Sequence, residues 1–287
     1  MSTAHHNRPL PVDIAPDPLD DPLAPLLAPP LAAALAREPD APSQAVRGRL
    51  LDRLAASSAA EAAMFTARQR RLAALPLAPG AMAQTLYRSQ PGATQRPGEP
   101  LLARLIRLDA GTVLQPASIG PEAAMRHREW LVLQGSARVG LQPLSMRDYH
   151  VVPAGCAGDP WSTEAGALLF LRESDMPAQA GDAPFTVHDA QAGWPDFAPG
   201  IQRRVLWQRA GQAALLYYAR PGAQVPNHTH GHDEECLMVQ GELFLDDLLL
   251  QPGDYQLAPA GTGHHVTATD TGVVIYAHGD LDLRFVA

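Results

Sequence analysis

Three histidines and three acidic residues lie within eight positions, in the stretch HTHGHDEE of residues 228–235. Side chains two apart on a β-strand project to the same face, so His228 and His230 can point together into a barrel interior. Glu234 follows a turn at Gly231 and can return to the same side. His264 follows a Pro-x-Gly turn, and an antiparallel strand there could bring its imidazole across. Three imidazoles and one carboxylate would then converge.

This set of donor groups predicts a site for one divalent transition metal. Imidazole nitrogen is a good ligand for Zn, Fe, Mn, Ni or Cu, and a carboxylate supplies negative charge. The ligand types alone do not choose among these metals.

The elements that must position these ligands read as successive short strands. From Phe65 onward, apolar runs such as WLVLQG, ALLFL and GVVIYA are broken by Gly and Pro. This part of the chain is also duplicated, because Phe65 recurs as Phe185, 120 positions later, and Tyr149 recurs as Tyr255, 106 positions later. At the separation of 106, further pairs are Glu129 and Glu235, Gly135 and Gly241, Asp148 and Asp254, and Gly166 and Gly272. We therefore predict two homologous β modules, residues 65–175 and 185–287.

The region before these modules has a different composition. Its first forty residues carry many of the 28 prolines, which prevents regular helix or sheet over most of that length. A short helix fits between Pro30 and Pro39, and a second one fits residues 43–64, with Ser43 as its N-cap. Residues 1–64 are thus predicted to be a proline-rich arm with short helices.

The histidine-rich segment resembles the two sequence motifs of the cupins. The first motif, GxxxxxHxHxxxExxxxxxG, is matched by Gly222, His228, His230, Glu234 and Gly241. The second, GxxxxxPxGxxH, is matched by Gly253, Pro259, Gly261 and His264. The resemblance implies an all-β fold of two tandem cupin (jelly-roll) β-barrels behind the short helical, proline-rich N-terminal segment. It also implies that His228, His230, Glu234 and His264 hold the metal.

The first module lacks the corresponding ligands. The separation of 106 places the four ligand positions on Glu122, Ala124, Arg128 and Gly158, and only His127 lies nearby. One imidazole cannot hold a transition metal. We therefore predict that the first barrel serves packing or partner binding, with a metal-free small-molecule pocket as the open alternative.

Several residues beside the predicted ligands occupy no motif position. We expect His232, His265 and Tyr255 to surround the ligands without binding the metal. Glu235 has an equivalent, Glu129, in the module without histidines, so we assign it to structure. Cys236 is interpreted as a small buried apolar residue rather than a redox sensor.

The run HTHGHDEECLMVQGELFLDD also resembles the ChrR-type cupins, which are attached to certain anti-sigma factors. The resemblance covers residues 65–287 and is stronger in the second copy. It implies zinc as the first metal candidate, an ECF-type sigma factor as a partner and a homodimer. The chain departs from that family at its N-terminus, because neither cysteine, Cys156 or Cys236, lies there to form a zinc-binding anti-sigma domain.

The bulk composition excludes other classes of function. The net charge is −8, which would repel a nucleic-acid backbone, so direct nucleic-acid binding is not expected. Two cysteines cannot form a disulfide framework, and we see no signal peptide or membrane span. These features predict a cytoplasmic protein.

Two functions from different classes remain open at this point. In the first, a regulatory metal cupin uses a zinc site to control a partner interaction. In the second, a mononuclear cupin dioxygenase holds Fe, Mn or Ni with open positions for O₂ and a chelating substrate.

Overall fold

The computed structural model describes residues 47–49, 51, 64–90 and 96–286. The chain divides into two compact units, Met1–Ser57 and Ser58–Ala287. In the first unit, residues 47–49 and 51 are helical. The predicted helix between Pro30 and Pro39, and the rest of the one predicted over residues 43–64, lie outside the described residues, apart from Met64.

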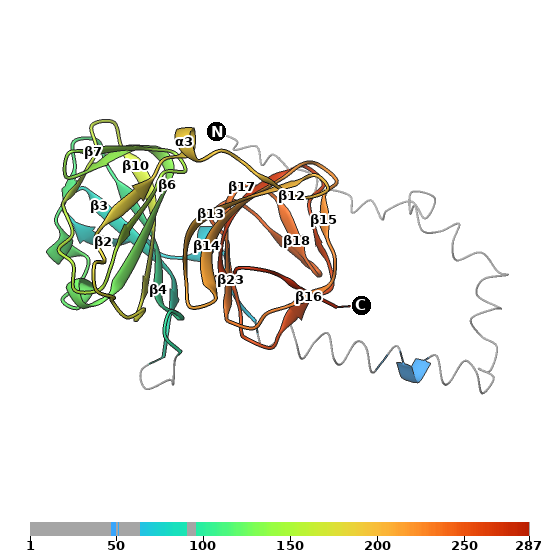
Figure 1. Cartoon of the computed structure of the whole chain (residues 1–287). Helices are drawn as coiled ribbons and strands as arrows, with labels where there is room; N and C mark the ends of the chain where they lie inside the picture. The colour runs from blue at the N-terminus through green and yellow to red at the C-terminus, as the bar shows by residue number, and fades with distance from the viewer. Residues whose placement is uncertain (1–46, 50, 52–63, 91–95, 287) are drawn as a thin grey trace, which may run out of the picture. The chain divides into compact units, whose positions relative to one another are not determined.

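The second unit is almost entirely β-structure and contains two barrels in tandem (Figure 1). The strands between residues 75 and 174 build the first barrel: β2 (Leu75–Ala78), β3 (Ala81–Arg88), β4 (Pro100–Leu108), β5 (Val113–Leu114), β6 (His127–Val139), β7 (Gln142–Ser145), β8 (Tyr149–Val152), β9 (Trp161–Ser162) and β10 (Ala167–Ser174). Short 3₁₀ turns lie at Gln69–Arg71, Pro116–Ser118 and Ala123–Met125.

The second barrel follows a single helical turn, α3 (Asp189–Ala192). Its strands are β12 (Asp196–Ala198), β13 (Ile201–Arg209), β14 (Gln212–Ala219), β15 (Gln224–Val225), β16 (His228–Thr229), β17 (Glu234–Gly241), β18 (Leu243–Leu245), β19 (Leu248–Leu250), β20 (Tyr255–Ala258), β21 (Gly263–His264), β22 (Thr267–Ala268), β23 (Val273–Asp280) and β24 (Arg284–Phe285). The all-β fold predicted from the sequence is confirmed.

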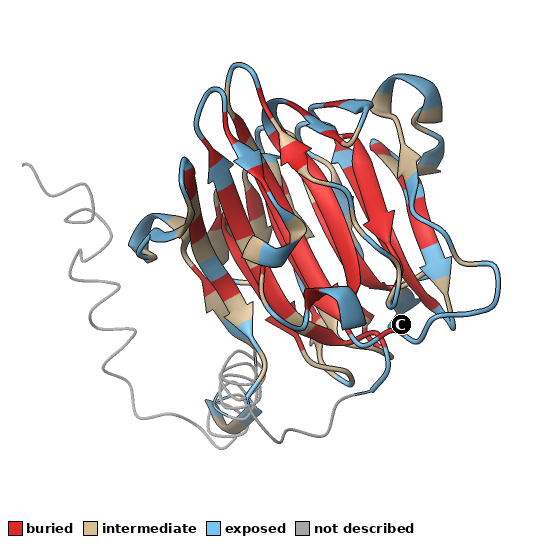
Figure 2. Ribbon diagram, turned by 90° about the vertical axis from the view of Figure 1, so that its left-hand side faces the viewer, coloured by how far each residue is buried: buried red, intermediate tan, exposed pale blue. Residues whose placement is uncertain are grey.

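Buried residues run along the strands, as Figure 2 shows in red, and the apolar ones among them form three clusters. One fills the first barrel around Ile106 and Trp130, and another fills the second barrel around Leu215 and Leu243. The third joins residues of both barrels, so the facing sheets are buried on both sides. Alternation along a strand therefore directs side chains either into a barrel or into the interface between the barrels.

The two barrels exchange a strand. β1 (Phe65–Ala67) precedes the first barrel but pairs with β20 of the second, with Phe65 opposite Leu257. β11 (Phe185–Val187) precedes the second barrel but pairs with β8 of the first, with Phe185 opposite Val151. The first strand of each predicted module is thus hydrogen-bonded to the sheet of the other module.

A repeated aspartate anchors the chain after each exchanged strand. Asp254 accepts hydrogen bonds from the Arg68 side chain, at 2.8 Å, and from the Gln69 backbone N–H, at 3.0 Å. Asp148, its equivalent in the first barrel, accepts one from the Asp189 backbone N–H, at 2.7 Å, and contacts His188 at 2.9 Å. The duplication seen in the sequence is therefore repeated in the contacts.

Within the described residues, no helix combines the length and the apolar character needed to cross a bilayer.

Candidate metal centre

The second barrel brings His228, His230 and Glu234 together. Each offers one ligand atom, and these three atoms all lie within 4.8 Å of one another. The Nε2 atom of His230 lies 2.8 Å from Oε2 of Glu234. His228 begins β16 and Glu234 begins β17, so a short loop through Gly231 carries the chain from one strand to the next.

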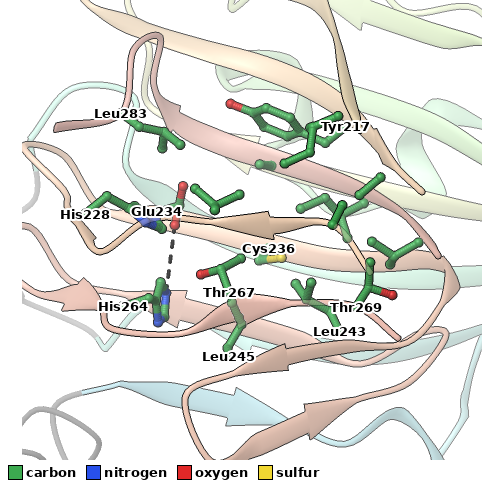
Figure 3. Close-up of a pocket in the computed structure, with 17 residues that line it drawn as sticks. Tyr217, His228, Glu234, Cys236, Leu243, Leu245, His264, Thr267, Thr269 and Leu283 are labelled. Atoms are coloured by element: carbon green, nitrogen blue, oxygen red, sulfur yellow. Dashed lines mark ion pairs between the residues drawn. The ribbon is translucent and has the colours of Figure 1, made fainter. Parts of the chain in front are cut away.

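His264 lies at the edge of this cluster. It pairs with His228 in the β16–β21 ladder, and its ring centre is 5.7 Å from that of His228 and 5.1 Å from that of His230. Its Nε2 atom lies 3.9 Å from the same Glu234 oxygen, so it stands slightly outside the tighter group of three (Figure 3). The carboxylate oxygen of Glu234 thus lies 2.8 Å from His230 and 3.9 Å from His264.

The hydrogen bonds around the histidines suit a metal. The Nδ1 atom of His228 contacts the Pro226 carbonyl oxygen at 3.0 Å, which leaves its Nε2 atom for the cluster. The Nδ1 atom of His230 is buried without a hydrogen bond to any described residue, and its Nε2 atom lies 2.8 Å from the Glu234 carboxylate. A buried polar atom without a partner is costly, and a metal ion would satisfy one ring nitrogen of this imidazole. The cluster can therefore hold a divalent metal.

The charges favour an ionised carboxylate at the cluster. Burial opposes ionisation of Glu234, but His230, His264 and His228 together outweigh burial and lower the pKa of that carboxyl to about 2. Burial lowers the pKa of His264, which favours the neutral imidazole that binds metals. Burial also acts to lower the pKa of His230, but Glu234 and Asp280 outweigh it and raise that pKa. A metal ion at His230 would therefore displace a proton that the carboxylate stabilises.

Asp246 is a site residue that the sequence analysis missed. Its Oδ2 atom lies 3.3 Å from Nδ1 of His264, and its Oδ1 atom accepts the backbone N–H groups of His265, at 2.7 Å, and Val266. The carboxylate thus orients the imidazole of His264. The acidic turn at Asp246 and Asp247 was the available signal, but it lies eighteen positions before His264 in the chain.

The three residues expected to surround the ligands lie in different places. His232 contacts Asp280 through Nδ1 and so stabilises the loop between His230 and Glu234. His265 is exposed and contributes its backbone N–H to Asp246. Tyr255 does not face the cluster, because it projects from the opposite side of the sheet and donates to Glu235 at 2.7 Å. That prediction for Tyr255 is corrected.

A cavity of about 60 Å³ adjoins the cluster. His228, Glu234 and His264 form part of its wall, Leu283 lies over that part, and the rest is mainly aliphatic (Figure 3). It is smaller than the cavity of roughly 150 Å³ that holds benzene in an engineered protein. It admits water or a ligand of a few heavy atoms next to the cluster.

Few of the residues that line this cavity could transfer a proton. Burial raises the pKa of the Tyr217 hydroxyl to about 12, and it also raises the pKa of the Cys236 thiol. Both groups therefore stay protonated, and the interpretation of Cys236 as a buried apolar residue is supported. Among the described residues that line the cavity, there is no arginine, no lysine and no carboxylate besides Glu234.

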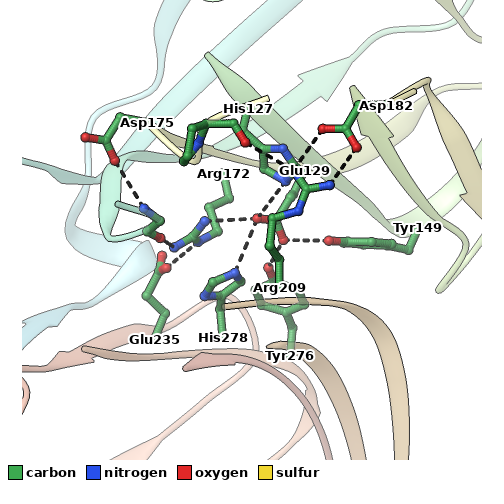
Figure 4. A network of polar contacts seen from close by, with 12 residues as sticks. His127, Glu129, Tyr149, Arg172, Asp175, Asp182, Arg209, Glu235, Tyr276 and His278 are labelled. Atoms are coloured by element: carbon green, nitrogen blue, oxygen red, sulfur yellow. Dashed lines mark hydrogen bonds and ion pairs between the residues drawn. The ribbon is translucent and has the colours of Figure 1, made fainter. Parts of the chain in front are cut away.

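The residue after Glu234 belongs to a second polar centre, between the barrels. Arg172 donates hydrogen bonds to Glu235 and, at 2.9 Å, to Glu129 (Figure 4). Tyr149 and Tyr276 donate to Glu129, and Tyr255 donates to Glu235. The network formed by Arg172, Glu129, Glu235 and these three tyrosines, hereafter the inter-barrel network, is fully buried. The assignment of Glu235 to structure is confirmed.

Comparisons with known proteins identify the fold. Residues 182–282 match the family described as the ChrR Cupin-like domain. No curated protein sequence matches the chain. The family match covers the second barrel, including all four predicted metal ligands, and the chain has the cupin fold.

Solved structures extend the similarity over both barrels. A protein from Pseudomonas aeruginosa, provisionally named glyoxylate-induced, aligns with a TM-score of 0.58 at 14% identity over 78% of this chain and 92% of that one. The oxalate decarboxylase of Lactobacillus farciminis gives 0.54 at 12% identity over 77% and 87%. A protein from Nostoc punctiforme, provisionally named a dioxygenase, gives 0.52 at 14% identity over 78% and 81%. At these identities the likeness concerns the fold alone.

Proposed function

We propose that this protein is a regulatory metal cupin of the ChrR type. One divalent transition metal, zinc in the first instance and iron, manganese or nickel as alternatives, is held by His228, His230, Glu234 and His264. Binding of a small ligand or oxidation at the metal then changes an interaction with a partner protein. The observation that carries the proposal is the position of the metal cluster on β17, directly beside the inter-barrel network.

The coupling follows from strand geometry. Glu234 and Glu235 are neighbours on β17, so their side chains project to opposite faces of the sheet. Glu234 faces the cluster, whereas Glu235 is bound to Arg172, which extends from the first barrel. A shift of β17 that draws Glu234 toward a metal must also move Glu235 against Arg172. Metal state and barrel contact are thereby linked through one strand.

The partner belongs to the same proposal. An ECF-type sigma factor is the first candidate, and a homodimer is the expected assembly. The capturing element would be the apolar face of residues 43–64, most of which lie outside the described residues. A cytoplasmic location is part of the proposal, in keeping with two free cysteines, Cys156 and Cys236.

A mononuclear dioxygenase is the second candidate. The cavity beside the cluster favours it, because catalysis requires an open side at the metal. An iron centre held by the same residues would bind O₂ and a chelating substrate. Two observations weigh against it. The cavity takes only a few heavy atoms, and apart from the proposed metal ligands its described lining residues offer no group that would exchange protons near neutral pH.

Metal analysis and oxygen consumption separate the two functions. The full chain is purified without added metal, its metal is identified by elemental analysis, and oxygen uptake is followed with β-diketones and catechol-like compounds. Zinc without uptake supports the regulatory function. Iron with substrate-dependent uptake, lost in His230→Ala, would replace it with the enzyme.

The partner is tested by affinity capture of candidate sigma factors on the full chain and on a chain without residues 1–64. Capture that disappears on truncation supports the helical segment as the binding element. Capture that survives truncation would move the partner interaction onto the barrels.

A further inference from the structure

The first barrel contains a cation of its own at the position of the metal cluster. Arg128 is the equivalent of Glu234, and Gly158 is the equivalent of His264. The Arg128 guanidinium lies against Gly158, where a Cβ atom would approach Nη1 to 3.0 Å. It donates to the Cys156 carbonyl at 3.2 Å, and its Nε atom is buried without a hydrogen bond to any described residue. The space that one barrel gives to an imidazole thus holds a guanidinium in the other.

Glu173 faces the same interior. It pairs with Arg128 in the β6–β10 ladder, so both side chains lie on the inner face of the sheet. The residue as a whole is 6% exposed, and its side chain lines the cavity described next. Burial raises its pKa, and the surrounding arginines lower the pKa by less. The carboxylate oxygens therefore keep acceptor capacity that a group in this cavity could use.

A cavity of about 640 Å³ opens in front of Glu173. Arg88, Arg104 and Arg126 line it together with Leu102 and Ile119, and we call it the arginine pocket. The Arg104 guanidinium donates to the Ile119 carbonyl at 3.0 Å, and Arg126 pairs with Glu122 at the rim. None of the three guanidinium groups lies within ion-pair distance of Glu173, although all of them act on its charge. The pocket therefore has the Glu173 carboxylate and three guanidinium groups on its wall, and this carboxylate does not pair with them across it.

The dimensions and charges define a ligand. Pockets for small molecules commonly measure about 300–1,000 Å³, and arginine recognises carboxylates through parallel hydrogen bonds. Anions alone would leave Glu173 unpaired and repelled, whereas a cationic group alone would be repelled by the arginines. A molecule with a carboxylate at one end and an ammonium group at the other satisfies both sides.

We propose that the arginine pocket of the first barrel binds a small amino acid, whose carboxylate contacts Arg88, Arg104 and Arg126 and whose ammonium group contacts Glu173. The first barrel then keeps the ligand-binding place of the fold but uses side-chain charges in place of a metal. This function does not depend on the metal cluster of the second barrel.

The test is calorimetric titration of the full chain with two probes, L-aspartate and succinate. Succinate has the two carboxylates of aspartate but no ammonium group. We expect saturable binding of aspartate and at least about tenfold weaker binding of succinate, which corresponds to about 1.4 kcal/mol. Arg88→Gln should weaken aspartate binding by about tenfold or more, because it removes one charge-assisted hydrogen bond to the ligand. Arg88 is exposed, so we expect this variant to fold normally.

Two further variants make the test specific. Glu173→Gln should bring aspartate and succinate to similar affinities, because it removes the partner of the ammonium group. Arg107→Gln is the matched control: it lies on β4, three residues from Arg104, and its exposed side chain projects from the other face. It should leave both affinities unchanged, and thermal melting establishes that each variant is folded.

Three results would overturn the proposal. The first is the absence of saturable aspartate binding up to about 10 mM, which is weaker than most specific small-ligand sites. The second is equal binding of succinate and aspartate by the unaltered chain, which would make the pocket a general anion site. The third is binding that His230→Ala abolishes and Arg88→Gln does not, which would place the ligand in the second barrel.

Discussion

The two barrels share a scaffold but differ at equivalent positions of their interiors. Where the second barrel has Glu234 beside His264, the first has Arg128 packed over Gly158. Where the second has Gly279 beside its cluster, the first has the buried Glu173. The loss of an imidazole in the first barrel is thus matched by a residue that brings its own positive charge. The comparison shows that one barrel of a duplicated fold can lack the histidine cluster and still have a polar interior.

Residues that are identical at equivalent positions of the two barrels stabilise the shared backbone. Gly135 and Gly241 both adopt positive φ, and a Cβ atom at either would collide with the carbonyl oxygen of its partner, Gly166 or Gly272. Repetition between the barrels therefore marks the scaffold, whereas divergence marks the two interiors.

A substitution in the inter-barrel network should have the largest effect on the free energy of unfolding. The two barrels also differ most clearly at this network. Arg172 neutralises Glu129 and Glu235, while the corresponding residue of the second barrel is His278. Arg172→Met would leave two buried carboxylates without their main cation, so we expect the free energy of unfolding to fall by about 3–5 kcal/mol. Denaturation in urea measures the change.

The exposed pair of Arg107 and Asp109 provides the control for this prediction. Its side chains are 65% and 61% exposed, so Arg107→Gln should cost less than about 1 kcal/mol. A combined variant with Arg172→Met, Glu129→Gln and Glu235→Gln should recover part of the loss. If Arg172→Met costs no more than the surface control, the network does not hold the barrels together.

A substitution in the metal cluster should have the next largest effect, on metal affinity. It tests whether metal binding is confined to the second barrel. His230→Ala removes a buried ligand, and we expect metal affinity to fall by more than about 100-fold, the upper range for residues that only support ligands. His150→Ala removes a buried histidine of the first barrel and should leave metal content unchanged. Competition with a chromophoric chelator measures both affinities. Equal losses in the two variants would contradict a site confined to the second barrel.

A substitution at Asp246 can give the second barrel the residue that the first barrel has at the equivalent position. The equivalent residue of the first barrel is Gly140, and both have positive φ, 52° at Asp246 and 58° at Gly140. Asp246→Gly therefore suits the backbone while it removes the carboxylate that orients His264. We expect about 10–100-fold weaker metal binding and only a small loss of thermal stability, because the two backbone N–H groups that lose Asp246 as acceptor lie at an exposed turn. Asp246→Asn keeps a hydrogen-bonding side chain and should show a smaller loss; a loss as large as that of the glycine variant would argue against orientation through the hydrogen bond.

The repeated tyrosines give the smallest effect and test the symmetry of the interface. Tyr149 and Tyr255 each donate to the glutamate of their own barrel, at 2.5 Å and 2.7 Å. Replacement of either by Phe leaves a carboxylate with one donor fewer, and should cost about 1–2 kcal/mol in unfolding free energy. Similar values for the two variants would support energetic as well as geometric equivalence. A loss confined to one of them would limit the equivalence to geometry.

The sequence predicts the parts of this structure that depend on local chemistry. The motif glycines Gly222, Gly253 and Gly261 all adopt positive φ, as tight turns require. Short apolar runs between such turns become strands, and the repeat of those runs reveals two modules. The spacing of His228 and His230 places them on one side of a strand, and the structure brings them to one point.

Other features depend on what lies across the fold. Tyr255 alternates correctly along its strand, but both faces of that sheet are buried, so alternation alone does not say which interior it enters. Asp246 reaches His264 only because the β18–β19 hairpin folds back beside β22. The exchange of β1 and β11 depends on which sheet edge is free, and three-residue strands contain no signal for that choice.

That exchange makes the barrels inseparable as expressed fragments. A piece cut at the family match, residues 182–282, would lack β1 and so present the backbone edge of β20, a ready template for intermolecular pairing. It would also carry β11 with no sheet to join and expose Glu235 without Arg172. Whoever wishes to study the metal cluster in isolation should therefore design a clone that begins before Phe65 and extends to the C-terminus.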